Sequence, residues 1–223
     1  MKTLLYSLLT ISILLTSCQG SSQTQDSKNK ISKNENIHPV QTEAINGLER
    51  AYFASGCFWC VEAIYESVKG VKEVISGYSG GHTENPTYES SNTGRTGHAE
   101  AVEVLYDPTI VSFSSLVDVY FGSQNPSQIN GQGPDRGSQY RSIVFYQNDD
   151  QKKIITAKKD FLTKALNRKI AAEVTPFQKF WKAEGYHQDY EKRNPYNRYI
   201  QNVSFPRLKR FHSKFPELIK DVH

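Results

Sequence analysis

The sequence predicts an α/β protein of the α+β type, a two-layer sandwich. We expect a ferredoxin-like β-α-β-β-α-β core, an extra helix and strand, and a long C-terminal coil. Short apolar runs typical of strands alternate with segments whose apolar residues recur at helical spacing, and clusters of Gly, Asn and Pro separate them. The chain of 223 residues also has the length of one such domain with extensions.

The first half of the core is a strand, a helix and two strands. Ala51–Ala54 is an apolar run that predicts a buried strand. A helix follows from Phe58 to about Ser67, because its apolar residues lie on one face, and Gly70 ends it. Further strands are predicted at Lys72–Tyr78 and at His98–Tyr106, where apolar and polar residues alternate. A loop separates these two strands.

The second half supplies the remaining elements. A helix is predicted from a candidate cap at Ser112 to Phe121. After a long loop we expect a strand at Tyr140–Tyr146, a helix at Asp149–Leu166 and a last strand at Ile170–Val174. The apolar stripe of that last helix comprises Ile154, Ile155, Phe161, Leu162, Ala165 and Leu166, with Lys158 interrupting it. The aromatic remainder predicts an ordered coil.

Residues 1–17 resemble a bacterial lipoprotein signal peptide. A positive residue precedes an apolar run that is too short to span a bilayer comfortably. Leu-Thr-Ser-Cys at 15–18 resembles a lipobox, which implies cleavage before Cys18 and lipidation of its thiol. The alternatives are an uncleaved anchor, or an ordinary signal peptide with an incidental cysteine. Residues 18–48 are polar and predict a flexible tether to a folded domain at 49–204. We assign no function to the basic extension at 205–223.

Composition excludes several classes of protein. The net charge of +4 is small and spread along the chain, which argues against a dedicated nucleic-acid-binding surface. Three cysteines are too few for a disulfide framework. No second Cys-x-x-Cys is present and the histidines lack ligand spacing, so we expect no metal site.

Cys57 and Cys60 form a Cys-x-x-Cys motif where a strand meets a helix. The unpaired N–H groups and dipole at a helix N-terminus stabilise a thiolate, which is the nucleophilic form of cysteine. Gly56 allows the tight turn that this position needs. Two other interpretations are a pair of small buried hydrophobic residues and half of a zinc site. We favour the redox interpretation.

The residues around this motif resemble those of the peptide methionine sulfoxide reductases of the A type. Gly-Cys-Phe-Trp at 56–59, followed by Glu62, resembles the family signature. Further matches stand in the family's order from about Ala51 to about Tyr196. They are Gly-Tyr-Ser-Gly-Gly at 77–81, Asn-Pro-Thr-Tyr at 85–88, Gly-His-Ala-Glu-Ala-Val at 97–102, Tyr-Asp-Pro at 106–108, Asp-Arg-Gly-Ser-Gln-Tyr-Arg-Ser at 135–142 and Tyr-His-Gln-Asp-Tyr at 186–190.

The resemblance implies an oxidoreductase that reduces the S epimer of methionine sulfoxide, free or in proteins. Cys57 is implied as the nucleophile that attacks the sulfoxide sulfur. Glu100 is implied as the acid that protonates the departing oxygen, a role that suits a carboxyl group kept neutral by an apolar pocket. The alternative for Glu100 is a solvated carboxylate on a strand.

Five more residues match the family's site. Tyr88 and Tyr140 correspond to the tyrosines that hydrogen-bond the sulfoxide oxygen, and Asp135 to a further polar residue. Phe58 and Trp59 correspond to the apolar wall around the methyl group on sulfur; the alternative is that they are ordinary core aromatic residues.

The resemblance fails for the resolving cysteine. Many members have glycine at the position of Cys60 and recruit a cysteine near the C-terminus, but no cysteine follows Cys60 in this chain. Cys60 is therefore the intramolecular candidate for forming a disulfide with the Cys57 sulfenic acid. We expect no bound cofactor, and a thioredoxin-like protein or a dithiol as reductant.

If Cys18 is lipidated, we expect the domain on the extracytoplasmic side of a bacterial membrane, with a thioredoxin-like partner on the same side. We expect the protein to be a monomer. Two other functions stay open. One is a general thiol-disulfide oxidoreductase, which would not need Glu100 and the paired tyrosines. The other is a non-enzymatic surface lipoprotein that binds peptides through its aromatic C-terminal segment.

Overall fold

The structure is a computed structural model that describes residues 37–221. Its main sheet has six strands in the order β7-β6-β1-β3-β2-β8. The strands are β1 Glu49–Ala54, β2 Val71–Ser79, β3 Ala99–Tyr106, β6 Ile143–Tyr146, β7 Glu173–Pro176 and β8 Phe180–Lys182, and β4 Gly131–Gln132 pairs with β5 Asp135–Arg136. The helices are α1 Phe58–Glu66, α2 Tyr88–Asn92, α3 Phe113–Gly122, α4 Asp149–Ala165, α5 Tyr190–Arg193 and α6 Phe205–Lys214.

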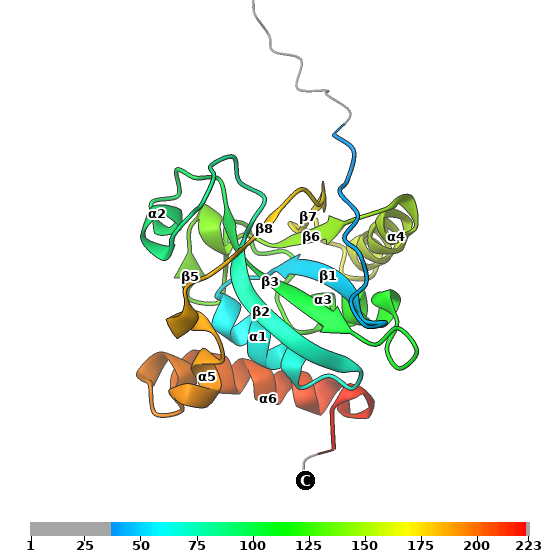
Figure 1. Ribbon diagram of the computed structural model, residues 1–223. Helices are drawn as coiled ribbons and strands as arrows, with labels where there is room; N and C mark the ends of the chain where they lie inside the picture. The colour runs from blue at the N-terminus through cyan, green and yellow to red at the C-terminus, as the bar shows by residue number, and fades with distance from the viewer. Residues whose placement is uncertain (1–36, 222–223) are drawn as a thin grey trace, which may run out of the picture. The chain divides into compact units, whose positions relative to one another are not determined.

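The predicted fold class is confirmed. Strands β6, β1, β3 and β2 are antiparallel neighbours, the order that a β-α-β-β-α-β core produces. Every residue of β3 is buried, which fits its place in the middle of the sheet. Helices α1 and α3 contribute to the main core on one face of the sheet, and Phe177 belongs to a smaller core that includes Tyr52 and Phe145. Helix α6 contacts α1 and lies beneath it in Figure 1.

Four elements differ from their predicted form. Helix α2 lies in the segment predicted as a loop, and Thr87 caps it by accepting a hydrogen bond from the Ser90 N–H. Strand β8 lies in the predicted coil and pairs with β2. Tyr140 belongs to a short 3₁₀ turn, Ser138–Tyr140, that precedes β6. Strand β7 begins at Glu173, later than predicted, and runs parallel to β6.

The apolar stripe predicted on α4 is partly wrong. Ile155 is fully buried, whereas Phe161 is 61% exposed and Leu166 is 47% exposed. The packed face instead includes two lysines, because Lys158 forms an ion pair with Asp118 on α3 and Lys159 donates a 2.6 Å hydrogen bond to the carbonyl of Ala172. The apolar stems of both lysines pack against the domain while their ammonium groups bind acceptors. The buried face of α4 therefore does not include Phe161.

The predicted tether is shorter than composition suggested. The Val40 N–H donates to the Phe177 carbonyl at 2.8 Å, and Thr42 donates to the Gln147 side chain through its N–H at 2.8 Å and its hydroxyl at 2.6 Å. These bonds fix the segment from Val40 onward to the domain despite its polar composition. The predicted signal peptide and Cys18 lie outside the described residues. Among residues 37–221, no helix has the length and apolar character needed to cross a membrane.

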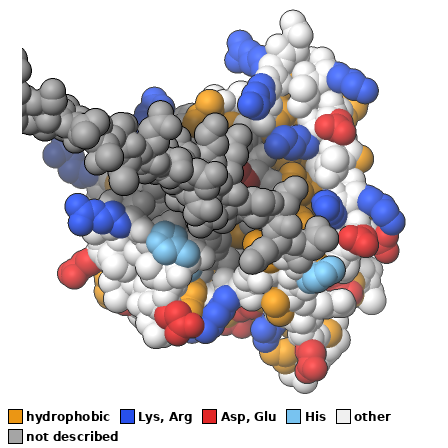
Figure 2. Space-filling model, turned by 90° about the horizontal axis from the view of Figure 1, so that it is seen from above, with side chains coloured by type: hydrophobic (Ala, Val, Ile, Leu, Met, Phe, Trp, Pro, Cys, Tyr) orange, Lys and Arg blue, Asp and Glu red, His pale blue; other side chains and the backbone are white. Residues whose placement is uncertain are grey.

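Charges are distributed as the composition suggested. On the face shown in Figure 2, basic and acidic side chains of the described residues lie interspersed around its edge.

Candidate active site

Cys57 lies in the turn between β1 and α1 and is the N-cap residue of α1, as predicted. The turn requires Gly56, whose φ is +77°. A Cβ added at Gly56 would also lie 2.5 Å from the Cβ of Gln132. The thiol of Cys57 is buried, with only 6% of the residue exposed. The turn therefore holds the thiol in a fixed place at the start of the helix.

Burial raises the pKa of Cys57 well above its ordinary value, and the neighbouring Cys60 and Glu100 act in the same direction. The expectation of a stabilised thiolate at Cys57 is therefore wrong for the ligand-free protein. Removal from water disfavours the charged form more than the helix N-terminus favours it. Cys57 stays a thiol until its proton has an acceptor.

Glu100 projects from β3 and is 2% exposed. Its Oε2 accepts a 3.0 Å hydrogen bond from the backbone N–H of Phe58, the residue after Cys57. Burial raises the pKa of Glu100 to about 8, and the charges of Asp135 and Cys60 act in the same direction. The carboxyl group is therefore mainly protonated at neutral pH, as a proton donor must be.

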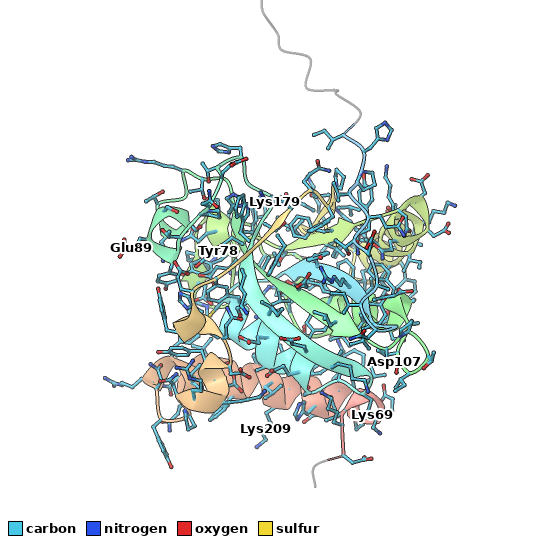
Figure 3. The ribbon with its side chains drawn as sticks, viewed as in Figure 1. Lys69, Tyr78, Glu89, Asp107, Lys179 and Lys209 are labelled. Carbon is cyan, nitrogen blue, oxygen red and sulfur yellow. The ribbon has the colours of Figure 1, made fainter. Side chains whose placement is uncertain are left out.

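Tyr88 and Tyr140 reach the same site from different segments. Burial, and then the nearby Glu100 charge, raise the pKa of both phenols, and Cys57 adds to the effect on each. Both hydroxyls therefore stay protonated and can donate hydrogen bonds. Tyr88 is held in place by its own N–H, which donates to Glu184 at 2.9 Å. Glu184 also accepts a 2.8 Å bond from Tyr78, which is labelled in Figure 3.

Phe58 and Trp59 form an aromatic group with Tyr88. The Phe58 and Tyr88 rings are 6.5 Å apart between centroids and nearly parallel. Trp59 stacks on Tyr190 with centroids 3.7 Å apart, and its Nε1–H donates to Nδ1 of His187 at 3.1 Å. Phe58 is buried, whereas Trp59 is half-buried. Such a group can provide an apolar wall beside the Cys57 thiol.

Asp135 lies on the Cys60 side of the site. Its Oδ2 accepts a 2.6 Å hydrogen bond from the Tyr199 hydroxyl. The hydroxyl oxygen of Tyr199 is also 3.7 Å from Sγ of Cys60. Burial raises the pKa of Asp135, and the hydrogen bond from Tyr199 acts in the opposite direction. The Cys60 side of the site is therefore polar, in contrast to the aromatic surroundings of Phe58.

Sequence reasoning missed several supporting residues. Tyr199 and Glu184 stand in the predicted coil, where many aromatic and polar residues gave no periodic signal. His187 and His98 are structural partners that hold neighbouring groups. His98 accepts from the Gly81 N–H at 3.1 Å and bonds the Thr83 carbonyl at 2.7 Å through its other ring nitrogen.

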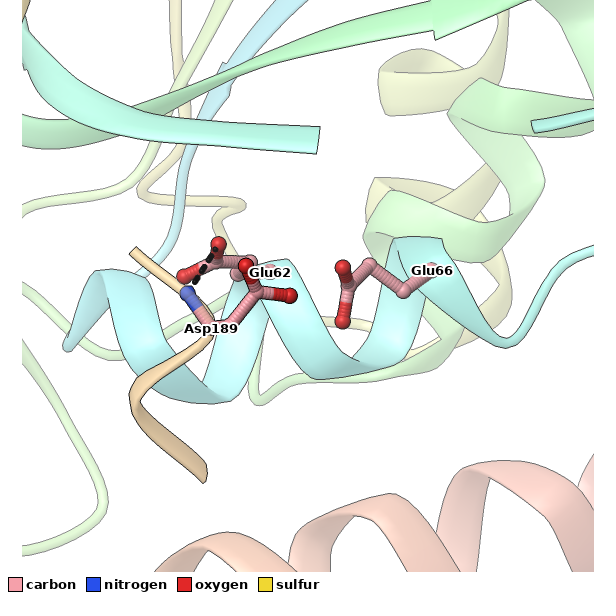
Figure 4. A group of neighbouring side chains, drawn as sticks. All are labelled: Glu62, Glu66 and Asp189. Atoms are coloured by element: carbon pink, nitrogen blue, oxygen red, sulfur yellow. Dashed lines mark hydrogen bonds between the residues drawn. The ribbon is translucent and has the colours of Figure 1, made fainter. Parts of the chain in front are cut away.

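One group of carboxylates has the spacing of a cation site. Glu62, Glu66 and Asp189 converge beside α1 (Figure 4). The Asp189 N–H donates to Glu62 at 2.9 Å, and the Lys192 ammonium lies 2.7 Å from Glu66 and 3.0 Å from Asp189. Lys192 therefore already supplies the cation, and the cluster ties the C-terminal coil to α1.

The geometry as a whole combines a buried thiol, a neutral carboxylic acid and two phenols around one position. Such a set can attack an electrophilic atom and protonate an oxygen that leaves it. A second thiol, Cys60, lies three positions along the chain, in the first turn of α1. Both cysteines are unpaired in this structure.

Comparison with known proteins gives a consistent result. A family model described as "Peptide methionine sulfoxide reductase" matches residues 49–219. A curated relative from Pasteurella multocida, peptide methionine sulfoxide reductase MsrA, is 46% identical over 172 residues, which cover 77% of this chain and 99% of the relative. The protein of the same name from Saccharolobus solfataricus is 43% identical over 173 residues, covering 78% of this chain and 98% of the relative.

Solved structures agree in fold. Methionine sulfoxide reductase A of Corynebacterium diphtheriae aligns with a TM-score of 0.62 at 33% identity, covering 72% of this chain and 87% of that one. The reduced form of Mxr1 from Saccharomyces cerevisiae aligns with a TM-score of 0.65 at 30% identity, covering 72% of this chain and 93% of that one.

Proposed function

The chain belongs to the peptide methionine sulfoxide reductase family, and from this premise we propose how its residues perform the reduction. The protein is an oxidoreductase that converts methionine sulfoxide to methionine. The finer proposal is that it acts on the S epimer, free or within oxidised proteins, with Cys57 as nucleophile and Glu100 as acid. The general thiol-disulfide alternative gains no support from the site, since disulfide exchange needs no neutral carboxylic acid.

The first half of the reaction removes the oxygen. The sulfur of Cys57 attacks the sulfoxide sulfur while Glu100 gives its proton to the oxygen, and the thiol proton of Cys57 replaces it on the carboxyl group. A bond forms between the two sulfur atoms as the S–O bond of the substrate breaks. The departing hydroxide then bonds to the Cys57 sulfur while the bond between the two sulfurs breaks, so methionine leaves and Cys57 becomes a sulfenic acid. Tyr88 and Tyr140 donate hydrogen bonds to the oxygen as its negative charge grows. Phe58 and Trp59 bind the methyl group.

The observation that carries this proposal is the buried carboxyl group of Glu100, which accepts the N–H that follows the nucleophile and whose pKa burial raises to about 8. The test is incubation of the purified protein with each epimer of methionine sulfoxide and a dithiol, with methionine measured by chromatography. We expect methionine from the S epimer alone. Equal conversion of the R epimer would contradict the stereochemical part of the proposal.

The second half closes a disulfide between Cys57 and Cys60, which a thioredoxin-like protein or a dithiol then reduces. Cys60 stands in the first turn of the helix that Cys57 caps, so a small adjustment brings the sulfurs to bonding geometry. We expect one equivalent of substrate to convert reduced protein into the linked form, detected as a mass loss in the peptide that contains both cysteines.

Cys60→Ser is expected to keep the first turnover and to stop at the sulfenic acid, trapped with a dimedone probe. Multiple turnover with thioredoxin should fail, because thioredoxin attacks disulfides. If Cys57 and Cys60 of the unsubstituted protein stay unlinked after one complete turnover, Cys60 has only a structural role. An external thiol then reduces the Cys57 sulfenic acid directly.

We also propose that the protein is a lipid-anchored monomer on the extracytoplasmic side of a bacterial membrane. The support is the lipobox-like sequence that ends at Cys18. Its thioredoxin-like reductant would then also be extracytoplasmic. Cys18→Ala is expected to release the protein from the membrane fraction or to leave the precursor unprocessed. Unchanged fractionation together with unchanged mass would overturn this assignment.

A further inference from the structure

Arg207 on α6 is a buried arginine whose charge acts on Asp135 from across a shared cavity, without forming an ion pair in the part of the chain that the structure describes. It is 7% exposed, and its guanidinium donates to the Ser123 carbonyl at 3.0 Å, the Ser55 carbonyl at 2.9 Å and the Ser55 hydroxyl at 2.8 Å. All three acceptors are neutral, and arginine stays charged in proteins. A buried charge of this kind is costly unless an anion lies near it.

The guanidinium lies beside the turn that carries the nucleophile. Ser55 stands two residues before Cys57, and Nη1 of Arg207 lies 3.7 Å from the position that a Cβ on Gly56 would take. Arg207 and Cys60 also line one cavity of about 760 Å³ between α6 and the 122–135 segment. Figure 1 shows α6, the helix that carries Arg207, running beneath α1 on the side away from the sheet.

Ionisable and polar groups face Cys60 from every neighbouring element. Cys57 comes from the same helix start, Glu100 from β3, Asp135 from β5, Tyr199 and Ser204 from the C-terminal segment, and Arg207 from α6. The hydroxyls of Tyr199 and Ser204 intervene between the thiol and the acids, because Tyr199 donates to Asp135 and Ser204 to Glu191.

Glu100 and Tyr199 lie near both thiols, but the cavity beside Arg207 is lined by Cys60 and not by Cys57. The guanidinium therefore lies on the Cys60 side of the pair. Consistent with this, the Cys57 thiol and then the Arg207 charge lower the pKa of Cys60 to about 7, against the effect of its burial. The charge of Arg207 therefore favours the thiolate form of Cys60.

We propose that Arg207 is a positioning residue for the recycling half of the reaction, holding Cys60 as the thiolate that attacks the Cys57 sulfenic acid. This inference rests on the proposed function and adds the group that makes its second step fast. The Cys60 thiolate forms the S–S bond, the S–O bond of the sulfenic acid breaks, and the departing hydroxide takes the Glu100 proton to become water. No outside oxidant is needed.

The same helix offers a matched control. Arg210 lines the same cavity but is exposed, and Lys209, labelled in Figure 3, lies on the side of α6 that faces away from α1. Neither side chain bonds the Ser55 turn. Arg210→Gln therefore changes the net charge as Arg207→Gln does, without removing the buried guanidinium.

The test measures the ionisation of Cys60 directly. In full-length protein carrying Cys57→Ser, the alkylation rate of Cys60 is followed from pH 5 to 10 by the mass of the tryptic peptide 51–69. Serine at position 57 removes the Cys57 thiol, the largest influence that lowers the Cys60 pKa, so the midpoint of this parent protein reports the influence of Arg207. We expect that midpoint below the ordinary thiol value of about 8.5. Arg207→Gln should raise the midpoint by about 1–2 pH units, Arg207→Lys should restore most of it, and Arg210→Gln should leave it unchanged. Equal midpoints in the Arg207→Gln and parent proteins would overturn the proposal.

A second measurement uses the protein with both cysteines. Arg207→Gln should release the first methionine at the rate of the unsubstituted protein, whereas disulfide closure at pH 7 should slow by about 10-fold as the thiolate fraction falls. If no methionine forms in either protein, the proposed function fails while the alkylation result still stands. If Arg207→Gln does not fold, the parent titration decides, because a Cys60 midpoint at the ordinary value of about 8.5 would overturn the proposal by itself.

Discussion

Cys57→Ser is expected to lower the rate of methionine sulfoxide reduction by at least about 10⁴-fold, the order of loss that follows removal of a catalytic nucleophile. A serine hydroxyl in this buried turn has no base strong enough to ionise it, and it forms no sulfenic acid. The residue is the N-cap of α1, and serine is a favourable N-cap residue, so the fold should be kept. The measurement is methionine formation under single-turnover conditions.

The control is Cys60→Ser, which removes a thiol from the same helix turn. We expect it to release one equivalent of methionine, whereas Cys57→Ser releases none. Circular dichroism and thermal unfolding of both variants exclude a loss through misfolding. Substantial turnover in the Cys57→Ser protein would mean that another group attacks the sulfoxide, and the whole scheme around Glu100 would fail with it.

The order of the core elements could be predicted because each carries its own local signal. Strand β3 alternates apolar with polar residues, and α3 has a Ser112 cap and an apolar face, so neither depends on distant residues for recognition. Strand β8 could not be predicted this way. Its three residues form a strand because β2 offers an unpaired edge to them, a fact that appears only once the sheet is built.

The active site shows the same division. Cys57 and Glu100 could be identified because both stand in motifs that resemble a known family. The direction of the Cys57 pKa shift was predicted wrongly, since a helix N-terminus is visible in sequence and the degree of burial is not. The role of Arg207 could not be predicted from the sequence for a related reason. Its contact with Ser55 joins residues 152 positions apart, and its basic neighbours on α6 are ordinary surface residues.

Glu100→Gln is expected to lower the rate of oxygen removal by about 10²–10⁴-fold, the usual contribution of a general acid. Glutamine keeps the shape of the side chain and can still accept the Phe58 N–H, but it has no proton to give. Substrate affinity should change little. The unsubstituted protein should lose activity as the pH rises through about 8, where Glu100 deprotonates, and the residual activity of Glu100→Gln should lack that decline. A loss confined to affinity would instead make Glu100 a substrate-positioning residue.

The same substitution should stabilise the fold at high pH. The folded-state pKa of Glu100, about 8, is above its unfolded value of 4.5, so ionising the buried group costs stability as the pH rises from 4.5 to 8. Above pH 8 the full penalty applies, and linkage sets its upper limit at roughly 5 kcal/mol. Glutamine carries no charge at any pH and avoids it. Urea unfolding at pH 5 and pH 9 should therefore show the variant gaining stability over the parent at pH 9 but not at pH 5. Equal differences at both values would show that Glu100 is not buried as a neutral acid, and with that the proton donor of the first step would be lost.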